Sequence, residues 1–239
     1  MPYKLILPTG KTRKVPRVTE ILRAGMPKPA VYDWELRGVA TWAAAHPEVV
    51  EQEGPDVAIS GFRAGNTAAA RGRAVHGWIA AYLKHENLPP LFPDEMGYTD
   101  AFKRWFDAHF DGRRPHDMRV EQTLTDSDIT VAGTADCIVG RQLYDWKTVG
   151  SREDREAHIW PDHLAQLGAY ASMTRPVVTG QVGRVSWPDI EVASIVRLYS
   201  DGSHRTHTIT GPELDDAIRL WRAVRQVAAA TMQTSRGAS

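Results

Sequence analysis

Three residues near the middle of the chain, Asp136, Asp145 and Lys147, have the types and spacing that metal-assisted chemistry needs. Asp145 and Lys147 are two apart in DWK, so in an extended strand both side chains point to the same side, separated by two rises of about 3.3 Å each. A turn at Gly140 would fold the preceding strand back and bring Asp136 beside them. Two carboxylates bind a hard divalent cation such as Mg²⁺ or Mn²⁺. A lysine beside that ion can orient a water as an ammonium, or deprotonate it as a neutral amine, because the nearby positive charge lowers the lysine pKa. Hydrolysis of a phosphodiester requires these groups.

Taken alone, the DWK triplet has a simpler explanation, because an acid and a lysine at this spacing also form surface salt bridges. The neighbouring motifs favour a catalytic role for this triplet over a surface salt bridge. Gly133 begins GTAD on the preceding strand, Gln166 and Tyr170 follow in QLGAY, and His76 ends GRAVH upstream. Gln166 and Tyr170 are one helical turn apart and share a helix face.

The motifs GTAD, DWK and QLGAY resemble the RecB-like branch of the PD-(D/E)XK nuclease superfamily, which pairs a GxxD strand and a (D/E)xK strand with a QxxxY helix. The resemblance covers about residues 72–170 and, more weakly, the opening segment VTEILRAGMPKPAVYDWE, which is similar to the start of phage exonucleases. It implies an α/β (α+β) fold with a restriction-endonuclease-like core. It also implies a metal-dependent DNA nuclease, an exonuclease of phage or bacterial recombination or repair, that hydrolyses phosphodiester bonds with a metal-activated water.

The resemblance also implies roles for particular residues. Asp136, Asp145 and Lys147 would be catalytic, and His76 and the backbone carbonyl of Trp146 would join the two acids as ligands of Mg²⁺ or Mn²⁺. The Trp146 indole would face away from Asp145 into the core. His76 by itself would more often be a structural histidine, so its ligand role depends on its place in the series.

Five further residues have weaker assignments. Glu121 corresponds to an acid on the strand before GxxD, and it either completes the catalytic site or lies on an exposed strand face. Gln166 and Tyr170 would contact the DNA strand, with a purely structural role as the alternative. Basic residues cluster at 11–17 and again at Arg63, Arg71 and Arg73. We expect Arg71 and Arg73 to contact DNA, although such clusters are as often solvated surface.

Composition limits the partners. The 29 basic and 29 acidic side chains cancel, so only local patches could attract DNA. The single cysteine, Cys137, excludes an internal disulfide and an iron–sulfur cluster, and any metal must therefore be held by oxygen and nitrogen. The apolar runs are too short for a membrane span or a signal peptide, which predicts a cytoplasmic protein without a membrane partner. The resemblance leaves room for a homo-oligomer and for a recombination partner protein.

Hydrophobic periodicity predicts one domain over residues 1–239, in which a central mixed sheet of about five strands is flanked by helices. Residues 1–66 would be a helical N-terminal elaboration with a polar connection over 46–61, residues 67–230 the nuclease core, and residues 231–239 a disordered tail. Val75, Ile79 and Leu83 recur every four residues and predict an amphipathic helix over 67–85. Residues 119–149 alternate and are broken by two polar turns, which predicts three consecutive antiparallel strands.

Two other functions are compatible with this pattern. A nuclease-derived DNA-binding subunit could keep the fold without activity, but the expected sign would be a gap in the acid–acid–lysine set, and these three residues are all present. In a different kind of enzyme, the acids would bind a metal that acts on a small phosphoester.

Overall fold

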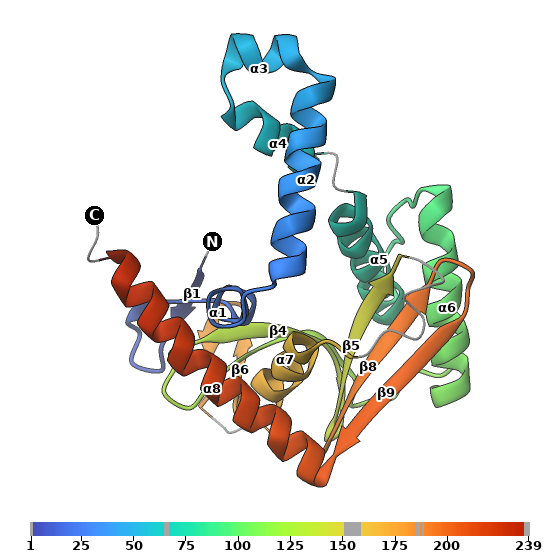
Figure 1. Ribbon diagram of the computed structural model, residues 1–239. Coiled ribbons are helices and arrows are strands. Elements are labelled where there is room, and N and C mark those ends of the chain that lie inside the picture. Colours follow the sequence, from blue (N-terminus) through green and yellow to red (C-terminus); the bar gives the residue numbers. More distant parts are fainter. Residues whose placement is uncertain (1, 65–66, 151–158, 185–186, 188, 237–239) are drawn as a thin grey trace. The chain divides into compact units, whose positions relative to one another are not determined.

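The computed structural model describes residues 2–64, 67–150, 159–184, 187 and 189–236 (Figure 1). Within these ranges the elements follow one another as β1 (Tyr3–Ile6), β2 (Thr12–Val15), α1 (Val18–Gly25), α2 (Pro29–Ala45), α3 (Pro47–Glu53), α4 (Asp56–Ala64), α5 (Thr67–Lys84), α6 (Pro93–Phe110), β3 (Arg119–Thr125), β4 (Ala132–Val139), β5 (Gln142–Val149), α7 (Pro161–Ala171), β6 (Arg175–Val178), β7 (Gln181–Val182), β8 (Val192–Tyr199), β9 (His204–Thr210) and α8 (Gly211–Arg236).

The chain forms two compact units. The first consists of Met1–Met26 together with Ala74–Ser239, and the second of Pro27–Arg73. The division falls inside α5, so the part of this helix from Ala74 onward belongs to the first unit. All nine described strands also belong to the first unit.

The first unit is built on one mixed sheet, with the strand order β2-β1-β7-β6-β3-β4-β5-β8-β9. Strands β3, β4 and β5 pair antiparallel, as the alternating pattern predicts. Strand β8 returns parallel to β5 after α7, and this crossover places α7 against the sheet. The three strands that carry the acids and the lysine are therefore neighbours in the middle of the sheet.

Helices cover both faces of this sheet (Figure 1). Helices α1, α7 and α8 share one hydrophobic core with β4, β5 and β8, where Leu143 and Ile195 are fully buried. On the other face, α5 buries the predicted stripe of Val75, Ile79 and Leu83 against Trp146 and Val196. Helix α6 adds Phe102, Trp105 and Phe106 to the same core. The central strands are thus packed between two layers of helices.

The second unit is helical. Helices α2 and α4 pack together through Trp34 and Phe62, whose ring centroids lie 5.1 Å apart edge to face. A cavity of about 570 Å³ lies beside this contact, and both rings line it together with Trp42 and His46.

The structure corrects several expectations. The described sheet has nine strands instead of about five. β1, β2 and β9 were missed because each buries only one residue, and β1 and β2 are only four residues long. Residues 46–61, expected as a polar connection, contain α3 and most of α4. The expected N-terminal helical elaboration includes the β1–β2 hairpin, and α8 continues to Arg236 through most of the expected disordered tail.

Candidate metal and catalytic site

Asp145 and Lys147 lie on the same side of β5 and contact each other. Lys147 Nζ is 2.6 Å from Asp145 Oδ2 and also donates a hydrogen bond to Gln166 Oε1 at 3.0 Å. The Asp145 carboxylate is almost fully buried, while the lysine side chain is 21% exposed. The alternation of the strand thus fixes the ammonium between a carboxylate and an amide oxygen.

Asp136 lies where β4 and β5 separate. These strands pair from Val139↔Gln142 to Cys137↔Tyr144, and one further step in the same register would place Asp136 opposite Asp145. At this point the Trp146 N–H donates a hydrogen bond to Asp136 Oδ2 at 2.8 Å. Because the Asp136 side chain accepts this hydrogen bond in place of a β4 carbonyl, the backbone pairing of β4 and β5 is interrupted between Asp136 and Asp145.

Asp136 forms a cluster with His76 and Glu121. One ligand atom from each of these three side chains lies within 4.8 Å of the other two. His76 reaches the cluster from α5, with Nδ1 at 3.4 Å from Asp136 Oδ1, and Glu121 comes from β3. One imidazole nitrogen and two carboxylates converge, and such a set could hold a divalent cation.

The backbone of Glu121 has an uncommon conformation. Its φ angle is +54°, in the left-handed region, although it lies inside a strand. A non-glycine residue in this region costs about 1–2 kcal/mol, and such strain often occurs at functional sites. The register of β3 and β4 continues through Gln122↔Ala135, so Glu121 faces Asp136 at the strained position. Sequence periodicity carries no signal for a positive φ.

Charges at the site act on one another. Burial raises the pKa of Asp136, but His76, Lys147 and the Trp146 N–H outweigh burial and bring this pKa below its usual value. Burial lowers the pKa of His76, but the nearby Asp136 carboxylate outweighs it and raises this pKa. Burial, followed by the charge of Asp136, raises the pKa of Glu121.

The Asp145–Lys147 pair behaves in a similar way. Burial raises the pKa of Asp145 more strongly than the charge of Lys147 lowers it. Burial lowers the pKa of Lys147, but the charges of Asp145 and Asp136 outweigh it, so this pKa lies above its usual value. In the metal-free protein the lysine is therefore an ammonium at neutral pH.

Gln166 and Tyr170 join this network from α7. Gln166 accepts the bond from Lys147 and donates through Nε2 to the Tyr170 hydroxyl at 3.3 Å. Burial raises the pKa of Tyr170 far above its usual value, so its hydroxyl stays protonated. The two residues of the QxxxY pattern thus form a hydrogen-bonded chain that begins at the lysine.

The Trp146 side chain points away from the acids, as expected. Its indole packs against Phe102 and Trp105, with ring centroids at 5.4 and 4.9 Å, on the opposite face of β5. Cys137 is likewise buried in that core. Arg71 and Arg73, expected to contact DNA, lie on the part of α5 that belongs to the second unit.

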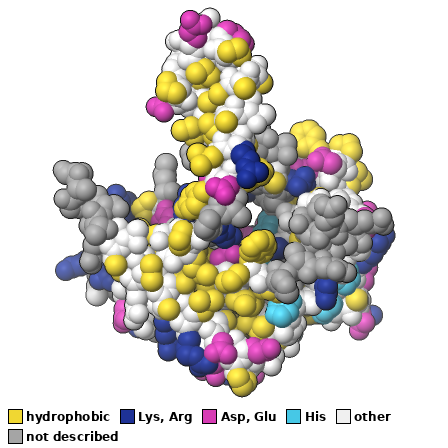
Figure 2. All heavy atoms as spheres, in the orientation of Figure 1, with side chains coloured by type: hydrophobic (Ala, Val, Ile, Leu, Met, Phe, Trp, Pro, Cys, Tyr) yellow, Lys and Arg dark blue, Asp and Glu magenta, His cyan; other side chains and the backbone are white. Residues whose placement is uncertain are grey.

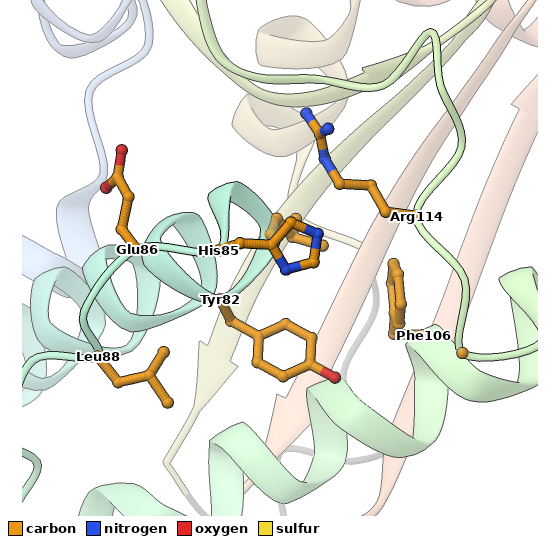
Figure 3. Close-up of a pocket in the computed structure, with 8 residues that line it drawn as sticks. Tyr82, His85, Glu86, Leu88, Phe106 and Arg114 are labelled. Carbon is orange, nitrogen blue, oxygen red and sulfur yellow. The ribbon is translucent and has the colours of Figure 1, made fainter.

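A separate cavity of about 310 Å³ lies at the C-terminal end of α5, lined by residues that include Tyr82, His85, Phe106 and Arg114. Figure 3 shows the rings of Tyr82, His85 and Phe106 around this space, with Arg114 at its edge. His76, Glu121, Asp136, Asp145 and Lys147 are not among the residues that line it. On the face shown in Figure 2, acidic, basic and histidine side chains are visible next to the hydrophobic surface around α7.

Comparisons with known proteins add little. No family model and no curated protein matches the chain. A solved structure described as the crystal structure of SSO0001 is similar over 91% of this chain and 78% of its own, with 16% sequence identity and a TM-score of 0.39. A likeness of this size bears on neither family nor activity. Among the described helices, none has both the length and the apolar character to cross a bilayer.

Proposed function

We propose that this protein is a divalent-metal-dependent DNA nuclease with a restriction-endonuclease-like core. One observation carries the proposal: an imidazole and two carboxylates converge beside a lysine that is held by a third carboxylate. The order of these residues along the chain resembles the PD-(D/E)XK pattern, and the four motifs meet in one region of the fold.

The donor set fits Mg²⁺ or Mn²⁺. His76 offers a nitrogen and Glu121 and Asp136 offer carboxylate oxygens, and Asp145 and the Trp146 carbonyl belong to the adjoining strand position. Carboxylate and carbonyl oxygens are the ligands that these hard cations prefer, and Mn²⁺ also accepts imidazole. When bound, such an ion lowers the pKa of a water and offsets charge on the phosphate.

The protein's own groups would do the rest. The Lys147 ammonium, fixed by Asp145 and Gln166, positions the attacking water and offsets the negative charge that develops on the phosphate. Gln166 and Tyr170, which form a hydrogen-bonded chain from this lysine, would contact the DNA strand, as the resemblance implies. Water forms the new bond to phosphorus as the bond to the leaving sugar oxygen breaks, and the products would carry 5′-phosphates, as is usual in the family that the motifs resemble.

Exonuclease action in phage or bacterial recombination or repair rests on the resemblance alone. The main alternative is an inactive nuclease-derived DNA-binding subunit, and another is an enzyme that acts on small phosphoesters. Labelled single- and double-stranded DNA incubated with Mg²⁺, Mn²⁺ or EDTA separates them. The proposal requires metal-dependent shortening of the labelled DNA. Binding without cleavage would support the inactive DNA-binding subunit. Turnover of a small phosphoester alone would support the enzyme that acts on small phosphoesters.

Lys147→Ala tests the assigned role of the lysine. Loss of an oriented ammonium should lower the cleavage rate by at least about 100-fold, the range for one acid–base or electrostatic group. Mn²⁺ binding, measured by calorimetry, should persist because the lysine donates no ligand. Retained turnover in this variant would refute the assignment.

A further inference from the structure

A row of three hydroxyl groups continues from the metal cluster toward the N-terminal hairpin. The Tyr3 hydroxyl lies 2.7 Å from Thr134 Oγ1, which in turn lies 2.9 Å from Thr123 Oγ1. Thr123 and Thr134 are directly opposite each other on β3 and β4. All three residues are partly buried, so each keeps some surface exposed to solvent.

Strand geometry connects this row to the cluster. Thr134 is two residues before Asp136 on β4, a step of two rises of about 3.3 Å along the strand. Thr123 is two residues after Glu121 on β3. The hydroxyl row therefore lies one two-residue step along both strands from the two carboxylates, a separation comparable to that between successive phosphates of one DNA strand.

The hydroxyls have spare hydrogen-bonding capacity. Each can donate one hydrogen and accept two, so the three groups have three donors. The two bonds within the row use two of these donors, and one remains for an acceptor from outside the row. A phosphate oxygen is such an acceptor.

A positive charge lies over the end of this row. The Arg17 guanidinium stacks on the Tyr3 ring, with its central carbon 5.1 Å from the ring centroid. The Arg17 guanidinium covers one face of the Tyr3 ring. The groups that could bind a ligand here are therefore the Tyr3 hydroxyl and the Arg17 charge. Arginine and hydroxyl side chains are typical contacts of the DNA backbone.

We propose that Arg17, Tyr3, Thr123 and Thr134 form a phosphate-binding subsite for the nucleotide next to the one cleaved. The inference rests on the proposed nuclease function and extends it: the ligand is the sugar–phosphate backbone, held without reading the base. Within the basic cluster at 11–17, the subsite uses Arg17 but not Arg13. Arg13 donates hydrogen bonds to the carbonyls of Asp128 and Ile129 and so has a structural role.

Lys14 provides a matched control. It pairs with Lys4 across the hairpin, while Tyr3 pairs with Val15, so Lys14 lies on the opposite face from Tyr3. Lys14→Gln and Arg17→Gln each remove one positive charge from the same short segment. A general electrostatic effect would weaken DNA binding equally in both variants, whereas the subsite predicts a loss in Arg17→Gln alone.

The test is fluorescence anisotropy of 5′-labelled single-stranded DNA in EDTA, where cleavage is not expected, at several salt concentrations. We expect Arg17→Gln to raise the Kd about tenfold and to reduce the salt slope by about 0.7, the value for one phosphate contact on a single strand. Tyr3→Phe removes only an oxygen; it should raise the Kd roughly threefold with an unchanged salt slope, since neutral contacts release no counterion. Lys14→Gln should bind as the wild type does.

Two results would overturn the subsite. One is equal affinity of Arg17→Gln, Tyr3→Phe and wild type in a protein that still cleaves DNA, which would leave the nuclease function standing. The other is an equal loss in Lys14→Gln and Arg17→Gln. A wild-type protein that neither binds nor cleaves DNA would refute the proposed function together with the subsite. Equal unfolding midpoints of the variants exclude misfolding as the cause of a loss.

Discussion

Gly133 and Tyr170 are in direct contact. A Cβ atom at Gly133 would lie 2.5 Å from Tyr170 Cε1 and 2.7 Å from Val18 Cγ2, closer than real Cβ contacts allow. The glycine of GTAD therefore gives room to the tyrosine of QLGAY, and two motifs that are far apart in the sequence form one packing unit between β4, α7 and α1.

This contact predicts that Gly133→Ala destabilises the fold by about 1–3 kcal/mol, the usual cost of overpacking a core. Gly77 provides the control, since a Cβ there meets nothing within 4 Å and the residue lies inside α5. Gly77→Ala should stabilise by roughly 0.5–1 kcal/mol, because alanine loses less backbone entropy in a helix. Urea denaturation measures both changes, and similar effects of the two variants would contradict the steric explanation.

Replacing Glu121 by glycine should change the stability of the fold and the affinity for metal in opposite directions. Glu121→Gly relieves the positive φ and should raise the free energy of unfolding by about 1 kcal/mol in EDTA. It also removes a carboxylate that faces Asp136, so the Mn²⁺ affinity should fall. Glu121→Gln removes the charge but keeps the strained backbone; it should bind Mn²⁺ equally weakly and be less stable than the glycine variant.

Calorimetric titration with Mn²⁺ and urea denaturation in EDTA give the two quantities for each variant. If Glu121→Gly bound Mn²⁺ as tightly as the wild type, Glu121 would not be a ligand. If it were no more stable than Glu121→Gln, the backbone would carry no strain.

The Asp145–Lys147 contact predicts coupling between the two residues. Asp145→Asn leaves the lysine ammonium without its nearest charge and should cost about 2–3 kcal/mol, somewhat less than a fully buried pair because Gln166 still accepts its hydrogen bond. Adding Lys147→Met removes the stranded charge, so the double variant should be more stable than Asp145→Asn alone. A double-mutant cycle by urea denaturation measures the coupling, and additive effects would contradict a direct interaction.

The His76–Asp136 pair predicts a pH window for stability without metal. The pKa of His76 is raised from 6.5, so its stabilising effect is fully present below about pH 6.5 and is lost as the pH rises through the raised value. The pKa of Asp136 is lowered from 3.8, so its effect is present above about pH 4 and is lost as the pH falls through the lowered value. The pair therefore stabilises the fold most between about pH 4 and 6.5.

Comparison with His76→Gln isolates this pair. In EDTA, the difference in unfolding free energy between wild type and variant should be largest near pH 5–6 and shrink at alkaline pH. With Mn²⁺ present, the difference in unfolding free energy between wild type and variant should instead increase as the pH rises, since a histidine that binds a metal must be a neutral imidazole. A difference that does not change with pH in EDTA would show that the pair contributes nothing.

The amino-acid sequence by itself determined the local pattern of the central elements. Alternation over 119–149 defined β3, β4 and β5, and the four-residue spacing of Val75, Ile79 and Leu83 defined the buried stripe of α5. It also placed Asp145 and Lys147 on one side of β5. These features follow from the repeat of strand and helix, which depends on neighbouring residues alone.

The tertiary structure decided which distant residues meet. It joined Tyr3 to Thr134 across 131 positions, directed the Trp146 N–H to Asp136, and put Glu121 in a left-handed conformation opposite Asp136. It also brought strands β1, β2 and β9 into the sheet, although each buries only one residue. Such contacts depend on the closure of long loops and on the packing of separate layers, and periodicity along the chain carries no information about either.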